Sequence, residues 1–315
     1  MLRRIADSLF WAARYLERAE WRARLVSVNH NLLIEGPAPA GNPWSSMLAI
    51  SGDQEVFEKH YENVDEMSVL TFFVLDERNP SSIRSCIDAA RENARSLRHR
   101  ISSELWLELN TLHLDAKQWT ATRLGTGEVF DFFQQLQERF YRIAGVINGT
   151  LPRGVGFDFL GLGILLERAE NVTRLLDIKY HYLLPRVEDV GGPIDLLQWA
   201  AVLRSASALE AYRLKYGNLI RTESVVEMLL FDPDFPRSAR YCVDRVETAL
   251  RRVARAAPDP AVQPVGLASD GLAGLLASRN ANEVIAGGLH DFLIDVQEEC
   301  ERISSAVFDQ YLRFE

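Results

Sequence analysis

The chain has 315 residues, of which 47% are hydrophobic and 25% are charged, and its net charge is −9. This balance is typical of a folded globular protein. A net negative charge without a basic stripe excludes general binding to nucleic-acid phosphates. The longest apolar runs are much shorter than a membrane-spanning segment, so we expect no contact with a membrane.

The cysteines and the N-terminus indicate a cytoplasmic location. Cys86, Cys242 and Cys300 are too few and too scattered for a disulfide framework. The chain begins Met-Leu-Arg-Arg, but Asp7 follows closely, and neither a secretory signal nor a transit peptide is predicted. A reducing compartment fits this cysteine usage best.

The first long segment, residues 3–33, has the spacing of a packed helix. Its apolar positions recur at alternating intervals of three and four residues, at Ile5, Leu9, Ala12, Leu16, Ala19, Ala23 and Val26. Such a stripe is a seam for packing against other helices.

Helical periodicity continues through nearly the whole chain. It predicts further helices at 44–51, 53–61, 65–75, 80–99, 103–122, 127–148, 157–184, 194–206, 207–216, 222–231, 236–256, 270–280 and 283–312. Asn79 and Pro80 are expected to begin the fifth of these fourteen helices, because Asn is a good N-cap and Pro suits the first helical position. The segment 256–271, rich in Pro and Ala, is expected to be a loop.

Two halves of the chain resemble each other. The pentapeptide LERAE occurs at 16–20 and again at 166–170. Residues 74–87 and 230–243 also match, through the pairs Asp76 and Asp232, Pro80 and Pro236, Arg84 and Arg240, and Cys86 and Cys242. Such repeats set an architecture. We therefore predict an all-α, pseudo-twofold helical bundle, in which repeats 1–150 and 151–315 pack as one domain over 1–315.

The charges of LERAE raise two hypotheses. On a helical wheel Glu20 and Glu170 fall inside the apolar stripe, and the residues four positions later, Arg24 and Arg174, are their natural partners. A buried charge must be paired. In the first hypothesis these pairs form an internal network that fixes helix register. In the second, carboxylates and their arginines line a central polar cleft, the carboxylates being Glu17, Glu20, Glu167 and Glu170.

A second charged run, residues 91–110, spans a predicted helix junction. Ser102 or Ser103 is expected to cap the following helix. Arg95 could simply pair with Glu104 across the turn. The alternative is an anion-binding site at the junction.

Catalytic motifs are absent from the sequence. No nucleophile elbow, P-loop or zinc-protease motif occurs, and the six histidines share no metal spacing. We therefore predict no metal and no cofactor. The Gly-Leu-Gly of residues 161–163 is expected to permit close helix packing, and Cys86 and Cys242 are expected to be small core residues.

Four segments together resemble the α-E domain family of bacterial proteins over essentially the whole chain. They are ADSLFWAARYLERAE, ARENARSLRHRISSELWLELN, PRGVGFDFLGLGILLERAENVTRLLD and HDFLIDVQEECERIS. The resemblance implies an all-α fold. It also implies partners, because genes of that family lie beside or fuse with circularly permuted ATP-grasp ligases and transglutaminase-like peptidases. A role in a peptide- or amide-modification system follows, with a peptide or amino acid as the bound substrate.

The same resemblance implies a set of site residues. The candidates for a cleft or substrate-binding site are Glu17, Arg18, Glu20, Arg91, Asn93, Arg95, Glu104, Arg153, Glu167, Arg168 and Glu170. This chain departs from the family pattern at Phe157, where Trp is usual, and at Ile164, where Arg is usual.

Three functions remain open from the sequence. The chain could be an accessory binding protein of an ATP-grasp ligase, and Arg18, Arg91 and Arg168 would then clamp a carboxylate. It could instead be an enzyme that transfers or hydrolyses an acyl or amide group with paired Glu residues as acid and base. The third function is a helical scaffold whose Glu–Arg pairs are all internal.

Overall fold

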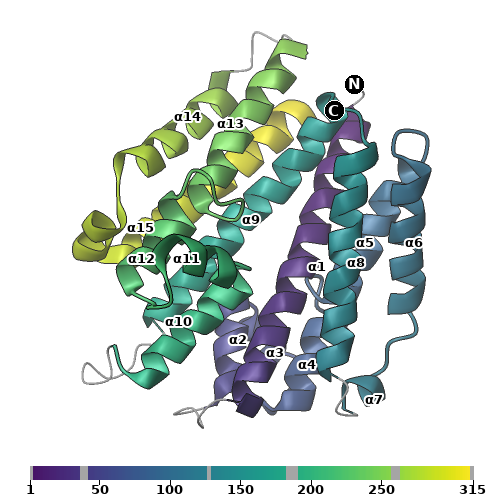
Figure 1. Ribbon diagram of the computed structural model, residues 1–315. Coiled ribbons are helices and arrows are strands. Elements are labelled where there is room, and N and C mark those ends of the chain that lie inside the picture. Colours follow the sequence, from purple (N-terminus) through teal and green to yellow (C-terminus); the bar gives the residue numbers. More distant parts are fainter. Residues whose placement is uncertain (1–2, 36–41, 126–128, 182–190, 257–262, 313–315) are drawn as a thin grey trace. The chain divides into compact units, whose positions relative to one another are not determined.

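The computed structural model describes residues 3–35, 42–125, 129–181, 191–256 and 263–312 (Figure 1). Within these ranges the chain forms helices, and no strand occurs. The predicted all-α fold is therefore confirmed. The chain divides into two compact units, one up to Ile164 and one from Leu165 onward.

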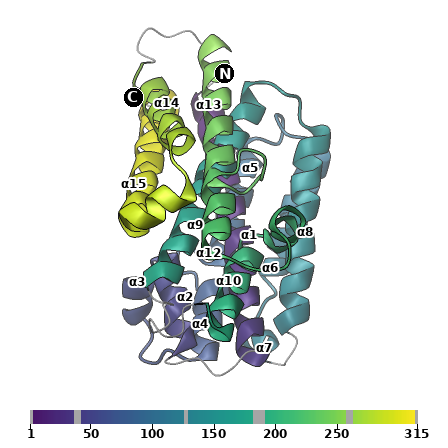
Figure 2. The same ribbon diagram turned by 60° about the vertical axis from the view of Figure 1, so that its left-hand side comes forward.

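The first unit is built around its longest helix. Its elements are α1 (Arg3–Glu35), α2 (Pro43–Ser51), α3 (Gln54–Glu58), α4 (Glu66–Val74), α5 (Ile83–Ser96), α6 (Ser103–Ala116), α7 (Ala121–Leu124), α8 (Val129–Thr150) and the first turns of α9 (Val155–His181). Helices α1, α5, α6 and α8 lie side by side, and the short helices α2, α3, α4 and α7 gather near one end of α1 (Figures 1 and 2).

Small residues let other helices approach α1 closely. Ala13, Ala19 and Ala23 of α1 are fully buried. The most extensive partner of α1 is α5, which buries Ala90 and Ala94. The apolar stripe predicted for residues 3–33 is thus a packing seam, as expected.

The first turns of α9 lie against the backbone of α1. A Cβ atom on Gly163 would stand 2.3 Å from the carbonyl oxygen of Phe10 and 2.9 Å from the Cβ of Ala13. A Cβ atom on Gly161 would meet no atom within 4 Å. Of the two glycines predicted to permit close packing, Gly163 does so.

The second unit contains the rest of α9, α10 (Pro193–Ser205), α11 (Leu209–Tyr216), α12 (Thr222–Val226), the π-helix η2 (Glu227–Phe231), α13 (Ala239–Ala256), α14 (Gln263–Ser278), α15 (Ala281–Val307) and the π-helix η3 (Phe308–Leu312). Helix α14 packs against both α13 and α15 (Figure 1). Gly288, with φ 110°, interrupts the helical geometry within α15, where one regular helix was predicted.

The loop predicted at 256–271 is wrong from Gln263 onward, because α14 begins there. Pro264 is its second residue, a position where a missing backbone N–H costs little. Leu272 and Leu276, four residues apart, are fully buried and hold the helix against the core of its unit. Residues 257–262 lie outside the described residues.

The predicted start of the fifth helix at Asn79 and Pro80 is also wrong. Helix α5 begins at Ile83, and Ser82 caps it by accepting a hydrogen bond from the Ser85 amide. Asn79 instead closes a turn, since its Oδ1 atom accepts the amide of Ser81 at 2.9 Å.

The repeated segments of the two halves share local hydrogen bonds. Asp76 Oδ1 accepts the amide two residues later at 2.9 Å, and Asp232 Oδ1 does the same. The thiols of Cys86 and Cys242 are buried, and each lies near the carbonyl oxygen of the proline six residues earlier, at 3.9 and 3.8 Å. The internal repeat thus has a local structural counterpart. The pseudo-twofold arrangement of the halves stays a prediction.

Both repeated aspartates are stabilised in their charged form. Burial alone would raise the pKa of Asp76, but hydrogen bonds from Arg78 and Tyr61 lower it below its ordinary value. In the second copy Lys215 takes the part of the arginine, at 2.8 Å from Asp232, and the pKa of Asp232 is likewise lowered against the effect of burial.

None of the described helices combines the length and the apolar character needed to cross a membrane.

We predict opposite effects for two neighbouring glycines. Gly163→Ala should destabilise the fold by about 1–3 kcal/mol, because its Cβ atom would overlap the α1 backbone. Gly161→Ala should be neutral or stabilising by up to about 1 kcal/mol, because Ala favours the helix and the space is open. Thermal unfolding of both variants measures this. Equal melting temperatures would contradict the close approach.

Candidate functional site

The charges of the first LERAE segment are buried along α1. Glu20 is 5% exposed and Arg24 is 2% exposed. Arg24 donates from Nη2 to Glu20 Oε1, so the predicted pair four residues apart is present. The same guanidinium donates to the hydroxyl of Tyr141 on α8 at 3.2 Å. This buried pair therefore connects α1 to α8.

A second buried arginine of α1, Arg22, contacts residues at the short helices α3 and α4. Arg22 forms an ion pair with Asp53 at 2.6 Å, just before α3. Its guanidinium carbon also lies 5.5 Å from the centre of the Phe73 ring on α4. These contacts support the interpretation of the α1 charges as internal connections between helices.

The second LERAE segment differs from the first. Glu167 is 2% exposed, whereas Glu170 is only half-buried and Arg174 is exposed. Glu170 is therefore less buried than predicted, and its pairing with Arg174 stays a prediction. Thr173, which is fully buried, turns its hydroxyl back to the Glu170 carbonyl oxygen.

Arg168 of the second LERAE segment contacts the repeated segment 230–243 of its own unit. Arg168 donates from Nη1 to the carbonyl oxygen of Pro236 at 3.2 Å, just before α13. In the first segment, Arg18 has its guanidinium carbon 5.9 Å from the centre of the Tyr15 ring.

Arg91 joins α5 to α6. Its Nε and Nη2 atoms donate to Asn110 Oδ1, each at 3.2 Å, and its Nη1 atom donates to Glu92. Its guanidinium carbon and that of Arg98 each lie 5.2 Å from the centre of the Trp106 ring. Arg91 thus has partners on both helices and links α5 to α6.

The predicted pairing of Arg95 with Glu104 is wrong. Arg95 donates to Glu92 at 2.8 Å on its own helix, because a partner three residues away is nearer than one across the junction. Glu104 is exposed and accepts from Ser103 Oγ. Asn93 donates to the carbonyl oxygen of Ala89.

The junction between α5 and α6 lies beside the junction between α8 and α9. Ser102 caps α6, as predicted, by accepting from the Leu105 amide. Its hydroxyl is 2.7 Å from that of Thr150, the last residue of α8. This contact brings two connecting segments, distant in sequence, to the same end of the unit.

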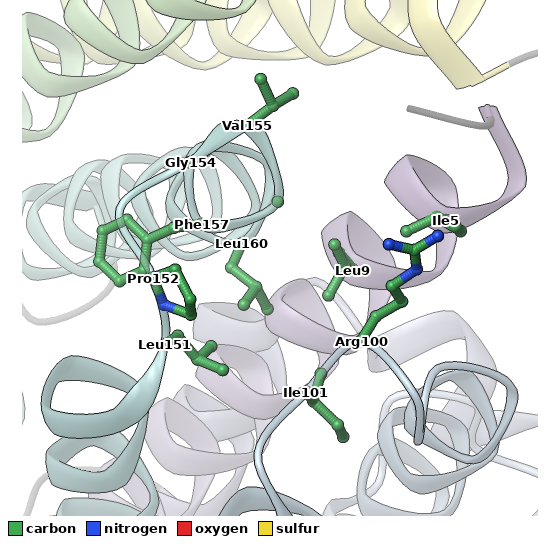
Figure 3. A pocket seen from close by; sticks show the side chains of 11 residues that line it. Ile5, Leu9, Arg100, Ile101, Leu151, Pro152, Gly154, Val155, Phe157 and Leu160 are labelled. Carbon is green, nitrogen blue, oxygen red and sulfur yellow. The ribbon is translucent and has the colours of Figure 1, made fainter.

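A cavity of about 370 Å³ lies at this place (Figure 3). Its walls come from three parts of the chain: the start of α1, the α5–α6 junction, and residues 151–160 at the start of α9. The buried side chains of Leu9, Leu160 and Leu151 form its inner walls, while Pro152 and Gly154 are exposed. The volume is at the lower end of the range for small-molecule sites.

Arg100 is the charged residue among those that line the cavity, and the other lining residues are apolar or glycine. It rises from the junction on the α1 side, beside Ile5, across the open space from Val155 and Phe157 (Figure 3). Arg100 is exposed, and it forms no ion pair with any residue in the described ranges.

Arg153 positions one wall of the cavity. It donates to the carbonyl oxygens of Asn148 (2.6 Å) and Leu151 (3.2 Å) at the end of α8. Its guanidinium carbon lies 4.1 Å from the centre of the Phe157 ring, on which it stacks. Of the sequence-predicted site residues, Arg153 is the one placed next to the cavity.

The N-terminus of α9 lies at the cavity, since Gly154, Val155, Gly156 and Phe157 line it. The amide of Asp158 donates to the Gly154 carbonyl oxygen at 3.1 Å, the first backbone bond of this helix. The amides of Val155, Gly156 and Phe157 precede that bond and have no acceptor within the helix. They carry partial positive charge. The buried carboxylate of Asp158 follows in the same turn but does not line the cavity.

Sequence reasoning did not find this cavity. The lining residues Ile5, Leu9, Arg100 and Ile101 read as ordinary helix and junction positions, and Phe157 was noted only as a departure from a pattern. The nearest signal in the sequence is the anion site considered for the α5–α6 junction, which lies beside the cavity and stays a prediction.

A comparison with protein families matches residues 1–312 to Alpha-E, described as a predicted alpha-helical domain with a conserved ER motif. The chain belongs to the Alpha-E family. The sequence has five Glu-Arg dipeptides, and two of them, Glu17–Arg18 and Glu167–Arg168, lie in the LERAE segments. The family expected from the sequence is thereby confirmed.

Three mycobacterial proteins are similar to this Alpha-E chain. They are Mb2597 of Mycobacterium bovis and MT2643 and Rv2567 of Mycobacterium tuberculosis, each described as an uncharacterized protein. Each is 22% identical over 266 residues, which cover 79% of this chain and 29% of the relative. The chain therefore matches less than a third of the length of these relatives. No solved structure matches it.

The described part of the Alpha-E domain contains no group of three or more His, Cys, Asp or Glu side chains placed to hold a metal ion. It does contain histidine–aspartate pairs. In the second unit His290 Nδ1 lies 2.6 Å from Asp177 Oδ1, which joins α15 to α9. The hydrogen bond to Asp177 raises the pKa of His290 above its ordinary value, against the opposing effect of desolvation.

We predict that Glu20→Ala destabilises the domain by about 3–5 kcal/mol, since it leaves the buried Arg24 without its carboxylate. The control is Glu92→Ala. Glu92 is half-exposed and also pairs with arginine, and its loss should cost less than about 1 kcal/mol. Denaturant unfolding gives both values, and a similar small loss in the two variants would argue against a buried network.

His290 should make stability depend on pH. A histidine whose folded pKa is raised contributes stability that is present below its unfolded pKa, about 6.5, and is lost as the pH rises through the folded pKa. The difference in melting temperature between the native chain and His290→Gln should thus be larger near pH 6 than near pH 9. A difference that does not change over this range would exclude the pairing as a source of stability.

Proposed function

We propose that this chain is a ligand-binding helical domain that acts with an ATP-grasp ligase in an amide- or peptide-forming system. In this proposal the chain contributes binding rather than bond-making. The observation that carries it is the cavity at the start of α9, whose walls are apolar and whose one charged lining residue is Arg100.

The composition of the cavity favours binding over catalysis. The lining side chains are those of Ile, Leu, Val, Phe, Pro and Arg, together with Gly. None of them is a nucleophile or a general acid or base at neutral pH. Small-molecule sites in proteins have this composition, with mostly apolar walls and a few polar groups that orient the ligand.

The partner in the proposal comes from the family resemblance. Genes of that family lie beside or fuse with ATP-grasp ligases and transglutaminase-like proteins. The matched region covers 29% of the mycobacterial relatives, so in those proteins it is joined to further sequence. A domain that binds one substrate for a neighbouring ligase is consistent with such arrangements.

Two other functions were open from the sequence. The scaffold function is supported by the pairs Glu20–Arg24 and Arg22–Asp53, which connect helices inside the first unit. It is compatible with a cavity elsewhere in that unit. The enzyme function with paired glutamates, and the polar cleft on which it depends, stay predictions.

The proposal is tested by affinity capture of the native chain from its own cells, with mass spectrometry of the captured proteins. We expect an ATP-grasp ligase, and we expect the purified ligase to capture the chain in return. The chain should then lower the substrate concentration at which the ligase is half-saturated, without forming product alone.

Two results would contradict the proposal. One is reciprocal capture that fails for every ATP-grasp ligase of the organism. The other is steady hydrolysis or transfer of an amide or ester by the isolated chain that is lost in Glu17→Gln or Glu167→Gln. The second result would establish the enzyme function instead.

A further inference from the structure

We infer that the cavity binds the carboxylate end of a small apolar molecule, with the carboxylate at Arg100 and the apolar part against Leu9 and Leu160. This inference rests on the proposed function and names the chemistry of its ligand. Its residues are not among the candidate site residues that the family resemblance implied.

The inner part of the cavity selects an apolar group. Leu9, Leu160 and Leu151 are buried even though they border an open space, and no polar side chain stands among them. A polar ligand group placed there would lose its hydrogen bonds to water without replacement. An aliphatic or aromatic group would instead bury apolar surface.

The rim selects a negative charge. Arg100 has no ion-pair partner in the described ranges, and no carboxylate lines the cavity. The N-terminal residues of α9, Gly154 to Phe157, also line the cavity, and a helix N-terminus favours an anion. Arg100 and the start of α9, at Val155 and Phe157, thus stand on two sides of the cavity (Figure 3), and both favour a negatively charged ligand group.

The charge count favours a carboxylate over a phosphate ester. One guanidinium balances one negative charge, and its planar pair of N–H groups matches the two oxygens of a carboxylate. A phosphate monoester carries nearly two charges at neutral pH. The cavity, about 370 Å³, holds a volume equal to roughly a dozen liquid water molecules, so the bound part must be small.

Two sources supply such a group. One is the C-terminal residue of a peptide with an apolar side chain, and the other is a short fatty acid. Both carry a carboxylate and an apolar part. Only the peptide end also carries an amide nitrogen, on the carbon that bears the carboxylate.

Calorimetric titration of the full chain tests the inference with four probes. N-acetyl-leucine represents the peptide end, hexanoate represents the fatty acid, N-acetyl-leucinamide lacks the charge, and hexyl phosphate carries the second charge. We expect at least one carboxylate to bind, the amide to bind at least about tenfold more weakly than N-acetyl-leucine, and hexyl phosphate to bind no more tightly than the carboxylates. Tighter binding of N-acetyl-leucine assigns the peptide source, and tighter binding of hexanoate assigns the fatty acid.

Three variants locate the site. Arg100→Gln should weaken carboxylate binding by about tenfold or more, because one charge-assisted hydrogen bond pair is lost. Arg98→Gln is the matched control, since Arg98 is also exposed in the same junction but stacks on Trp106 outside the cavity, and its affinity should be unchanged. Val155→Phe should fill the opening and abolish binding. Circular dichroism checks that each variant stays folded. If Val155→Phe unfolds, the test rests on Arg100→Gln, because Arg100 is exposed in a turn and its replacement should leave the fold intact.

The inference is overturned if neither carboxylate binds, if the amide binds as well as the acid, or if Arg98→Gln weakens binding as much as Arg100→Gln. Tighter binding of hexyl phosphate would overturn the assignment to a carboxylate. These measurements use the isolated chain alone. A chain that captures the ligase but binds no carboxylate refutes this inference only, and a chain that binds carboxylates but captures no ligase refutes the proposed partner only.

Discussion

The first unit depends on the close approach of α9 to α1 at Gly163. Side chains normally hold helix backbones apart, but here the Phe10 carbonyl oxygen occupies the place of a Cβ atom. This approach fixes the start of α9 relative to the start of α1. Leu160 and Phe157, within two turns of Gly163, consequently stand across from Leu9 and Ile5 with a cavity between them. The second LERAE begins three residues after the same glycine, at Leu166.

Charges in the first unit fall into two groups with different surroundings. Those inside α1 are paired and desolvated, as in Glu20 with Arg24 and Arg22 with Asp53, where removal of one partner strands the other. Arg100, which lines the cavity, is exposed and has no carboxylate partner in the described ranges. Paired internal charges fasten helices together, whereas an exposed arginine beside apolar walls is available to a ligand. This difference is why the cavity, rather than the LERAE glutamates, is the better supported binding site.

Much of the fold could be predicted because its signals are local. Helix periodicity placed both ends of α1 and α8 within two residues, and the serine cap of α6 follows from its own sequence. The start of α5 was misplaced because Asn79 and Ser82 are both good caps, and the turn around Asn79 decided between them. The cavity was out of reach because residues near 5, 100 and 155 meet only in the folded unit. A helical wheel likewise placed Glu170 inside the apolar stripe, whereas the structure has Glu170 half-buried and Glu167 buried.

A crystal structure of the chain grown with N-acetyl-leucine tests the central claim most directly, because it shows where the ligand lies rather than how tightly it binds. The account predicts the carboxylate within hydrogen-bonding distance of the Arg100 guanidinium, with the leucine side chain against Leu9 and Leu160. A ligand bound at the LERAE glutamates, or one whose side chain points into solvent while the cavity stays empty, would contradict it.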